Sequence, residues 1–289
     1  MNSSDKAAIL SEALPYFQRF RGKTFLIKIG GSAMDDEELL SALMRDIVFL
    51  EVAGINPILV HGGGKFISAA MKKAGLEAVF VGGLRVTSAE AVAIVEETLG
   101  ETINPNLVAL INQHGGRATG IPGTGVFQAV RIQGTGADGK PVDIGRVGKV
   151  ESCLTDDVLY ATSCEIVPVV SPLGKEIGTG ETLNVNADLA AAALARTLKP
   201  AKLVYISDVP GLLANPSDPS SLIPSVTPEA ADGLIDSGVI SGGMIPKIRS
   251  ALDALHAGVD KVHFIDGRVP HTLLLEIFTQ EGIGTEITR

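Results

Sequence analysis

Two strand-like runs of this chain each end in a glycine loop that leads into a helix-like run. The first run is Thr24–Ile29, followed by Gly30 and Gly31, and the second is Pro57–His61, followed by three glycines. Glycine lets the backbone approach a ligand closely, and the start of a helix offers free N–H groups at the positive end of a dipole. Lys28 adds a full positive charge beside the first loop. The pattern therefore predicts a binding site for a phosphate or a carboxylate.

The order of these runs predicts an α/β fold with a doubly wound, parallel sheet. A helical pattern over Asp36–Ala53 joins the first two strands, and short connections in such a unit give a parallel pair with a right-handed crossover. Ile166–Val170 and Lys202–Ile206 are further buried-strand candidates, and an alanine-rich helix lies between them. Strand and helix alternate to the C-terminus with no linker and only a soft lobe boundary near Arg196, which is typical of layered α/β proteins.

The segment after the second glycine loop is less regular. A short strand is expected at Val79–Val81, with Arg85 in the loop that follows it. Thr87 and Glu90 have the spacing of a capping box, which predicts the start of a helix that runs to about Leu99.

Residues 115–148 are rich in glycine and carry short β-like pieces, which predicts hairpins at one edge of the sheet. Within this segment, residues 134–139 match the spacing of the dinucleotide-binding fingerprint. No strand leads into them and no helix leaves them, so we interpret the match as a hairpin tip rather than a nucleotide site.

The N-terminal residues Asp5–Leu14 place apolar side chains on one helical face, which Phe17 continues beyond Pro15. Pro15 is expected to kink or end this helix, because proline lacks the N–H donor. An amphipathic helix ahead of the first central strand has no obvious place in the core. Packing on a neighbouring subunit is one interpretation, and packing on the chain's own sheet is the other.

Charge and composition exclude several classes of function. The net charge of −9 gives no general attraction to nucleic acid or to an anionic membrane, so a few local cations must hold any bound anion. No apolar stretch approaches the ~20 residues of a membrane span, and no signal-peptide pattern opens the chain. The two cysteines, Cys153 and Cys164, argue against a disulfide framework. We therefore expect a cytoplasmic protein without nucleic-acid or membrane partners.

Lys247 is the second candidate cation. It lies in the first turn of a predicted helix, where the dipole disfavours a positive charge, and it follows Gly242 and Gly243, so we expect it to face an anion. The Walker pattern, the Gly-x-Ser-x-Gly elbow and the His-Glu-x-x-His zinc motif are all absent from the sequence. His61, next to the triple glycine, is expected to make a hydrogen bond at a strand end rather than act as a general base.

Six motifs, in order along nearly the whole chain, resemble those of the amino acid kinase family: Lys28–Ser32, His61–Gly64, Leu84–Thr87, Asn184–Asp188, Ser207–Gly211 and Gly242–Lys247. The resemblance implies a three-layer αβα fold with a mostly parallel central sheet and two lobes in one chain. Within the family, the motifs look like those of the branch that acts in arginine biosynthesis. That likeness implies transfer of the γ-phosphoryl group of ATP, with Mg²⁺, to the side-chain carboxylate of N-acetyl-L-glutamate.

The same resemblance implies roles for individual residues around the reacting groups. The catalytic residues are two lysines that flank the migrating phosphoryl group and an aspartate that holds both: Lys28, Lys247 and Asp188. The acceptor is met by two backbone N–H groups, by an arginine that pairs with its α-carboxylate and by an asparagine: Gly63, Gly64, Arg85 and Asn184. The nucleotide is held by loops around the second lobe: Gly30, Gly31, Asp208, Gly211, Gly242 and Gly243. No protein ligand for the metal is implied.

Regulation and assembly are implied less directly. The leading helix and the C-terminal tail resemble those of arginine-inhibited members, which places four residues near an inhibitory L-arginine: Lys202, His271, Glu276 and Gly282. Such members form a homo-oligomer, a hexamer built as a ring of dimers, with a dimer as the minimum, and a PII-type signalling protein is a further candidate partner. The corresponding division is 1–22 for oligomerisation, 23–195 for acceptor binding and dimerisation, and 196–289 for nucleotide binding and regulation.

Two departures from the family pattern and two alternative functions remain. Lys65 follows the triple glycine where a small residue or proline is usual, and residues 120–125 replace the usual Ser-Gly-Lys-Asp type of turn. One alternative is a kinase of the same fold that acts on glutamate, aspartate, carbamate or a nucleotide. The other is a catalytically silent amino-acid sensor, against which the presence of both lysines and Asp188 argues.

Overall fold

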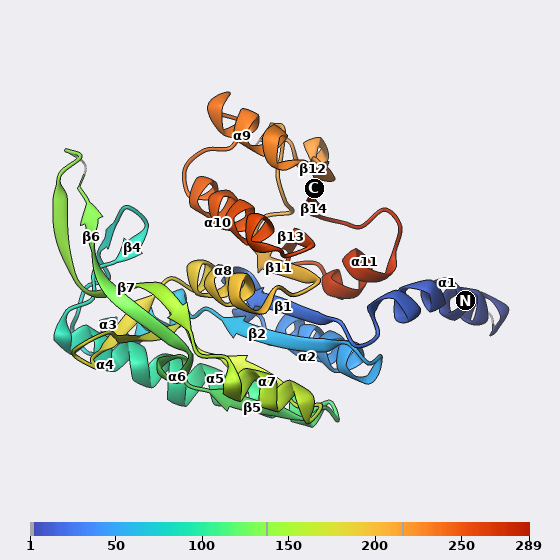
Figure 1. The fold of residues 1–289 in the computed structure, drawn as a ribbon, viewed down its shortest axis with the longest axis horizontal. Coiled ribbons are helices and arrows are strands. Elements are labelled where there is room, and N and C mark those ends of the chain that lie inside the picture. Colours follow the sequence, from blue (N-terminus) through green and yellow to red (C-terminus); the bar gives the residue numbers. More distant parts are fainter. Residues whose placement is uncertain (1–2, 137, 216) are drawn as a thin grey trace.

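An eight-stranded sheet runs through the molecule (Figure 1). The structure is a computed structural model that describes residues 3–136, 138–215 and 217–289. Every neighbouring pair in the sheet is parallel except the pair formed by the last two strands of the chain. The strands, from one edge to the other, are β12 (Ser225–Val226), β14 (Thr285–Thr288), β13 (Lys261–Asp266), β11 (Lys202–Ser207), β1 (Thr24–Ile29), β2 (Asn56–His61), β8 (Val167–Val170) and β5 (Ala118–Ile121). The expected, mostly parallel sheet is confirmed.

Helices cover both faces of this sheet, which gives three layers (Figure 1). One face packs on helices that include α2 (Glu37–Val52), α5 (Asn104–Gln113) and α11 (Thr272–Phe278), and the other packs on helices that include α7 (Asp156–Ser163), α8 (Ala187–Leu198) and α10 (Met244–Ala257). Side chains alternate between the faces of a strand, so Ile27 belongs to the first apolar layer and Leu26 to the second. By the same alternation, Lys28 lies on the face that α8 covers.

A small closed barrel stands beside the sheet. Its strands are β6 (Phe127–Thr135), β7 (Pro141–Cys153), β9 (Leu173–Glu176) and β10 (Thr182–Val185). The antiparallel β6–β7 pair forms the long hairpin that projects in Figure 1, so the interpretation of 134–139 as a hairpin tip is correct for the described residues, which leave out residue 137. Hairpins were expected from residue 115, but β5 and the one-turn helix α6 (Gly123–Val126) precede them, and β5 is an edge strand of the main sheet.

The N-terminal helix α1 spans Ser3–Phe20, continues through Pro15 and projects from the body of the protein (Figure 1). Pro15 was expected to kink or end this helix, and of these two outcomes the end is wrong. Its last turns pack on the same chain, with the Phe17 ring 5.2 Å from that of Phe278. Leu10 and Leu14, on the apolar face of the preceding turns, remain 67% and 53% exposed.

Two local expectations near the second glycine loop need correction. Arg85 lies in a two-residue strand, β4 (Leu84–Arg85), that pairs with β3 (Phe80–Val81), and not in a loop. Ser88, not Thr87, caps α4 (Ala89–Glu96) by accepting a hydrogen bond from Ala91 N. Thr87 instead donates its hydroxyl to the carbonyl of Arg85. The helix then passes into a π-helical segment, η2 (Glu97–Ile103), before α5.

The remaining elements complete the connections. They are the 3₁₀ turn η1 (Gly31–Met34), α3 (Gly64–Lys73), the 3₁₀ turn η3 (Pro219–Ser221) and α9 (Pro228–Asp236). The predicted lobe boundary after residue 195 falls inside α8, and the division into lobes stays a prediction. Among the described residues, no helix has both the length and the apolar character that crossing a membrane requires.

Candidate active site

A pocket lies where the carboxyl ends of β1 and β2 meet. The strand register places Ile29 beside His61, and Gly62 N donates to Ile29 O at 2.7 Å, so the two glycine loops lie side by side. Together with the start of α8 they line a pocket of about 210 Å³. This is smaller than the ~300–1,000 Å³ of most sites for drug-sized ligands. The pocket suits a small acceptor molecule.

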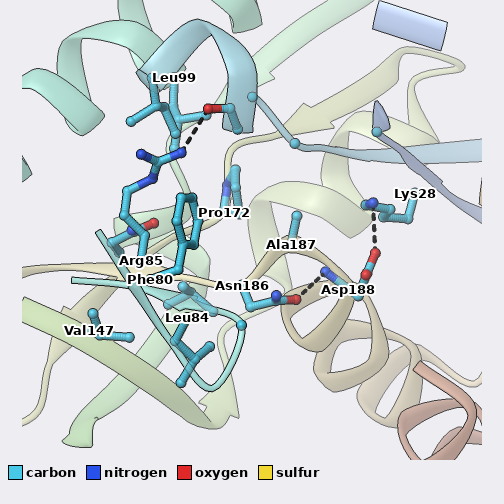
Figure 2. Close-up of a pocket in the computed structure, with 18 of the residues that line it drawn as sticks. Lys28, Phe80, Leu84, Arg85, Leu99, Val147, Pro172, Asn186, Ala187 and Asp188 are labelled. Carbon is cyan, nitrogen blue, oxygen red and sulfur yellow. Dashed lines mark hydrogen bonds and ion pairs between the residues drawn. The ribbon is translucent and has the colours of Figure 1, made fainter. Parts of the chain in front are cut away.

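One carboxylate at this pocket contacts two lysines from different elements. Asp188 lies in the first turn of α8, which is capped by Asn186, whose side chain accepts hydrogen bonds from the N–H groups of Asp188 and Leu189. Lys28 Nζ is 2.7 Å from Asp188 Oδ1 (Figure 2), and Lys247 Nζ is 3.6 Å from Asp188 Oδ2. The structure thus brings together the three residues expected to be catalytic.

The electrostatics of this cluster favour a bound anion. Burial raises the pKa of the Asp188 carboxyl, but attraction to Lys28 and then to Lys247 outweighs burial and holds the pKa below its ordinary value of 3.8. Two ammonium groups therefore face one carboxylate, and the cluster has a positive surplus. Lys247 also lies in the first turn of α10, where the helix dipole adds to that surplus.

The first glycine loop is shaped by its neighbours. A Cβ on Gly30 would fall on Lys28 Nζ, so glycine leaves the room that the ammonium group occupies. Gly31 has φ +65°, which favours glycine, and a Cβ there would lie 3.4 Å from the backbone N of Asp208. The loop therefore comes close to the carboxyl end of β11 and forms, with β1, a backbone cradle open to a ligand.

Arg85 is a buried cation at the other end of the pocket. Its Nη2 donates to Gly64 O at 2.7 Å and to Ser68 Oγ at 2.9 Å, and its guanidinium carbon lies 4.7 Å from the centre of the Phe80 ring (Figure 2). Burial lowers the pKa of Arg85. The residues that the structure describes place no carboxylate at ion-pair distance from it, although buried charges are usually paired. An anionic ligand would supply the missing partner.

The remaining acceptor residues line the same pocket. Gly63, Gly64 and Asn184 belong to its wall, and Asn184 Nδ2 donates to Thr87 Oγ1 at 3.1 Å. Phe80 and Asn186 are pocket residues whose roles the sequence analysis missed. A phenylalanine in the short strand just before Arg85 is a usable signal for a cation–π contact, and Asn186 lies inside a motif already recognised.

The residues expected around the nucleotide are less closely grouped. Gly242 and Gly243 immediately precede α10, and a Cβ on either would meet open space. Their backbone is therefore accessible at a helix start. Asp208 follows β11 directly and approaches Gly31, as described above. Gly211 lies farther along the same connection and is packed against Thr285 of β14.

Replacing Gly211 by alanine is expected to lower the free energy of unfolding by about 1–3 kcal/mol. Gly211 has φ +145°, and a Cβ there would lie 2.5 Å from Thr285 Oγ1 and 3.0 Å from its backbone N. Urea denaturation of the variant measures the loss. Gly233→Ala is the matched control, because Gly233 lies within α9 and has open space at its Cβ position. Equal stabilities of the two variants would contradict the packing role of Gly211.

A second pocket, of about 470 Å³, holds three of the four residues expected near arginine. Lys202, Glu276 and Gly282 line it, together with the end of α1. Lys202 Nζ lies 2.7 Å from His263 Nε2, whose Nδ1 lies 2.6 Å from Glu276 Oε1. Burial lowers the pKa of Lys202 to about 8.

The structure does not bring His271 to this pocket. His271 precedes α11, and its Nδ1 lies 2.7 Å from Asp46 Oδ1 of α2. The His271 backbone is in the left-handed region, with φ 58°, which turns the chain into the helix. The family resemblance placed His271 near arginine by its position in the sequence. Its side chain, however, points to Asp46 and not into this pocket.

The described residues contain no group of three or more His, Cys, Asp or Glu side chains arranged to hold a metal ion. Both cysteines are free thiols and are partly exposed.

Comparison with known proteins places the chain among kinases. The model of the amino acid kinase family matches residues 23–266. An acetylglutamate kinase of Akkermansia muciniphila is 63% identical over 285 residues, which cover 99% of this chain and 96% of that protein. The acetylglutamate kinase of Nitrosospira multiformis is 46% identical, with 99% of this chain and 97% of that protein covered.

Solved structures give the same architecture. N-acetylglutamate synthase from Neisseria gonorrhoeae, complexed with coenzyme A and N-acetyl-glutamate, is 27% identical and superposes with a TM-score of 0.85. The match covers 98% of this chain but only 63% of the synthase. The same synthase complexed with coenzyme A and L-arginine gives a TM-score of 0.81 at 25% identity, covering 98% of this chain and 65% of the synthase. The family model, the relatives and the αβα architecture agree, and the chain belongs to the amino acid kinase family.

Proposed function

We propose that this protein phosphorylates the side-chain carboxylate of N-acetyl-L-glutamate with ATP, giving N-acetyl-L-glutamyl 5-phosphate and ADP in arginine biosynthesis. The observation that carries the proposal is the arrangement of cations in and beside one small pocket. At one end Lys28 lines the pocket and shares Asp188 with Lys247, and at the other end no carboxylate of the described residues lies at ion-pair distance from Arg85. A dicarboxylate bound between the two ends would give the cations at each end a carboxylate partner. The names of the relatives that match the whole chain support this assignment.

The acceptor would be held by its α-carboxylate. Arg85 has a planar guanidinium that matches a carboxylate with paired hydrogen bonds, and Phe80 and Ser68 restrict its movement. Gly63 and Gly64 would donate backbone N–H groups at the start of α3, and Asn184 would add a side-chain contact. This arrangement would aim the side-chain carboxylate at Lys28.

The nucleotide would lie over the β11 and α10 side of the pocket. The cradle at Gly30 and Gly31 and the open backbone before α10 fit the phosphates, because both offer N–H groups without side chains in the way. Asp208 is close to the first loop. Mg²⁺ bound with the nucleotide would supply positive charge to the phosphates, which would themselves provide most of its ligands.

Charge neutralisation would be the main catalytic contribution of the chain. Two unit charges ~3 Å apart repel by about 5 kcal/mol at an effective dielectric constant near 20, so two anionic reactants need cations between them. Lys28 and Lys247 would donate to oxygens of the migrating phosphoryl group, while Asp188 fixes both ammonium groups. Positioning and electrostatics supply most of the rate in phosphoryl transfer, so no general base is required.

The pocket also argues against free glutamate as the acceptor. Asp188 is the one acidic residue among those lining the pocket, and it is already paired with two lysines. The ammonium group of free glutamate would therefore lose its water without gaining a carboxylate partner. We expect kcat/KM for free glutamate to be at least about 10²-fold lower than for the acetylated substrate.

Formation of an acyl hydroxamate tests the reaction directly. The protein is incubated with ATP, Mg²⁺ and hydroxylamine, and N-acetyl-L-glutamate is compared with glutamate, aspartate and carbamate. Product from the acetylated substrate alone supports the proposal. Product from another acceptor would support a different kinase of this fold, and a folded protein that reacts with none of them would support the amino-acid sensor.

Feedback inhibition by L-arginine is a further part of the proposal. The pocket at the end of α1 contains Lys202, Glu276 and Gly282, and the solved synthase complex with L-arginine is a structural relative. Exposed apolar residues on the projecting part of α1 favour assembly of dimers into a hexamer through that helix. A PII-type protein would be a separate regulator.

Adding arginine to the hydroxamate assay should lower product formation, and Glu276→Gln should weaken the inhibition. The reason is that Glu276 is a buried carboxylate in the pocket and would pair with the arginine guanidinium. Turnover without arginine serves as the control. Unchanged inhibition of the folded variant would contradict the assignment of this pocket.

A further inference from the structure

His61 is a fully buried histidine directly behind the second glycine loop, and the proposed mechanism does not use it. It is the last residue of β2. Its Nδ1 lies 2.8 Å from the carbonyl oxygen of Gly62, and its Nε2 lies 3.2 Å from Asn104 Nδ2. A buried polar side chain with a partner on each nitrogen, next to reacting groups, is a candidate for a positioning role.

The hydrogen bonds define which nitrogen of His61 carries the proton. Asn104 Nδ2 also lies 2.8 Å from the carbonyl oxygen of Val169, which can only accept, so the amide nitrogen faces both groups and donates to each. His61 Nε2 must then be the acceptor, and the proton lies on Nδ1, which donates to Gly62 O. Burial lowers the pKa of His61 to about 4, so the ring stays neutral at physiological pH.

The carbonyl that His61 holds belongs to the peptide that also contains Gly63 N–H. A trans peptide is planar, and its C=O and N–H point in opposite directions. Fixing the Gly62 carbonyl therefore fixes the direction of the Gly63 N–H, on the side away from His61. Gly62, Gly63 and Gly64 line the pocket, so the N–H group that points away from the core is available to a ligand there.

The π-helical segment η2 packs against Gly63, the residue that carries this N–H group. A Cβ on Gly63 would lie 2.6 Å from Ile103 Cδ1 and 2.8 Å from Leu99 Cδ2, so both side chains close against the Gly63 α-carbon. Asn104 follows this segment as the first residue of α5. The π-helical segment and the residue that follows it therefore supply the apolar side chains that pack on Gly63 and the Asn104 amide that orients His61. π-helical turns often occur at functional sites.

We propose that His61 and Asn104 are positioning residues for the phosphoryl transfer, which hold the Gly62–Gly63 peptide so that Gly63 N–H donates to the reacting carboxylate and phosphoryl oxygens. The inference rests on the proposed function. It predicts a loss in kcat rather than in binding of ATP, because the N–H bond would strengthen as charge develops in the transition state.

Two variants at one position isolate the contact. His61→Asn places an amide N–H near the position of Nδ1, and His61→Leu fills the space without a donor. Both lose the contact with Asn104, so they differ in the hydrogen bond to Gly62. We expect kcat to fall about 10–10²-fold in His61→Leu, and His61→Asn to recover most of it, with KM for ATP unchanged in both. A folded His61→Leu with wild-type kcat, or equal kcat values in the two variants, would overturn the proposal.

The proton position on His61 provides a test that needs no variant. ¹⁵N spectra of wild-type protein labelled at histidine should show Nδ1 protonated and Nε2 unprotonated from about pH 5 to 8. A protonated Nε2, or an imidazolium at pH 6, would overturn the arrangement even if a variant failed to fold. The hydroxamate assay of the wild-type protein distinguishes failure of the proposed function from failure of the His61 proposal. An inactive wild-type protein would contradict the proposed function and not the His61 geometry.

Discussion

Replacing Lys28 by alanine is expected to lower the turnover number about 10²–10³-fold, the range for losing one transition-state donor. Lys28 is buried at the end of the central strand, and its ammonium group is 2.7 Å from Asp188. Lys28 and Arg85 are the only cations among the described residues that line the pocket, and Lys247 lies at the other oxygen of the same carboxylate. Phosphoryl transfer under saturating ATP and N-acetyl-L-glutamate measures the effect, and Lys247→Ala should give a loss of the same order.

Two further variants make this result interpretable. Lys28→Met keeps the apolar stem and removes the charge, so it should be as slow as the alanine variant if charge is the cause. Lys23→Ala removes an exposed lysine just before the same strand and should keep wild-type turnover. Circular dichroism and urea denaturation show whether each variant is folded. A folded Lys28→Met enzyme with wild-type turnover would refute the assigned role.

Arg85→Ala should raise KM for N-acetyl-L-glutamate about 10²-fold or more, while KM for ATP changes little. The reason is that the α-carboxylate would lose its buried partner, and no other cation lies at that end of the pocket among the residues lining it. Arg85→Lys keeps the charge but loses the planar fork, so its KM should lie between those of the alanine variant and the wild type.

The control for this change is Arg117→Ala, which removes an exposed arginine that pairs with Glu165 and does not line the pocket. It should leave both KM values unchanged. Arg85 also donates to Gly64 O and Ser68 Oγ, so the free energy of unfolding must be measured for each variant. An unchanged KM for the acceptor in folded Arg85→Ala would contradict the proposed contact with the α-carboxylate.

The sequence specified the central architecture because the relevant signals are local. Apolar runs that end in glycine, such as Thr24–Ile29, follow from strand propensity and from the backbone freedom of the next residue. The neighbour relation between the two loops follows from short crossover connections. The ion pair between Lys28 and Asp188 could not be predicted from strand propensity or from the crossover connections. Its prediction depended on a resemblance of motifs, since two residues so far apart in the chain carry no local sign of contact.

The N-cap of α4 and the continuation of α1 through Pro15 differ from the prediction for a common physical reason. Thr and Ser are both favoured at the N-cap, but the Thr87 hydroxyl donates to Arg85 O and accepts from Asn184, and Ser88 caps the helix. Pro15 does not end α1, because Ser11, whose carbonyl loses its donor, is exposed to water, and Phe17 packs the following turn on Phe278. At the N-cap of α4 and at Pro15, contacts with residues distant in the sequence or exposure to water determined the local structure. The local sequence shows neither.

The central position of β1 has a consequence for synthesis of the chain. β1 pairs on one side with β2, which leaves the ribosome soon after it, and on the other with β11, which begins only at Lys202. At ~5–20 residues per second, the second side stays without its partner for about 10–35 s. During that interval the nascent protein carries an apolar strand with an open edge, the kind of surface that invites association between chains. Chaperone dependence should therefore be concentrated between completion of β2 and emergence of β11.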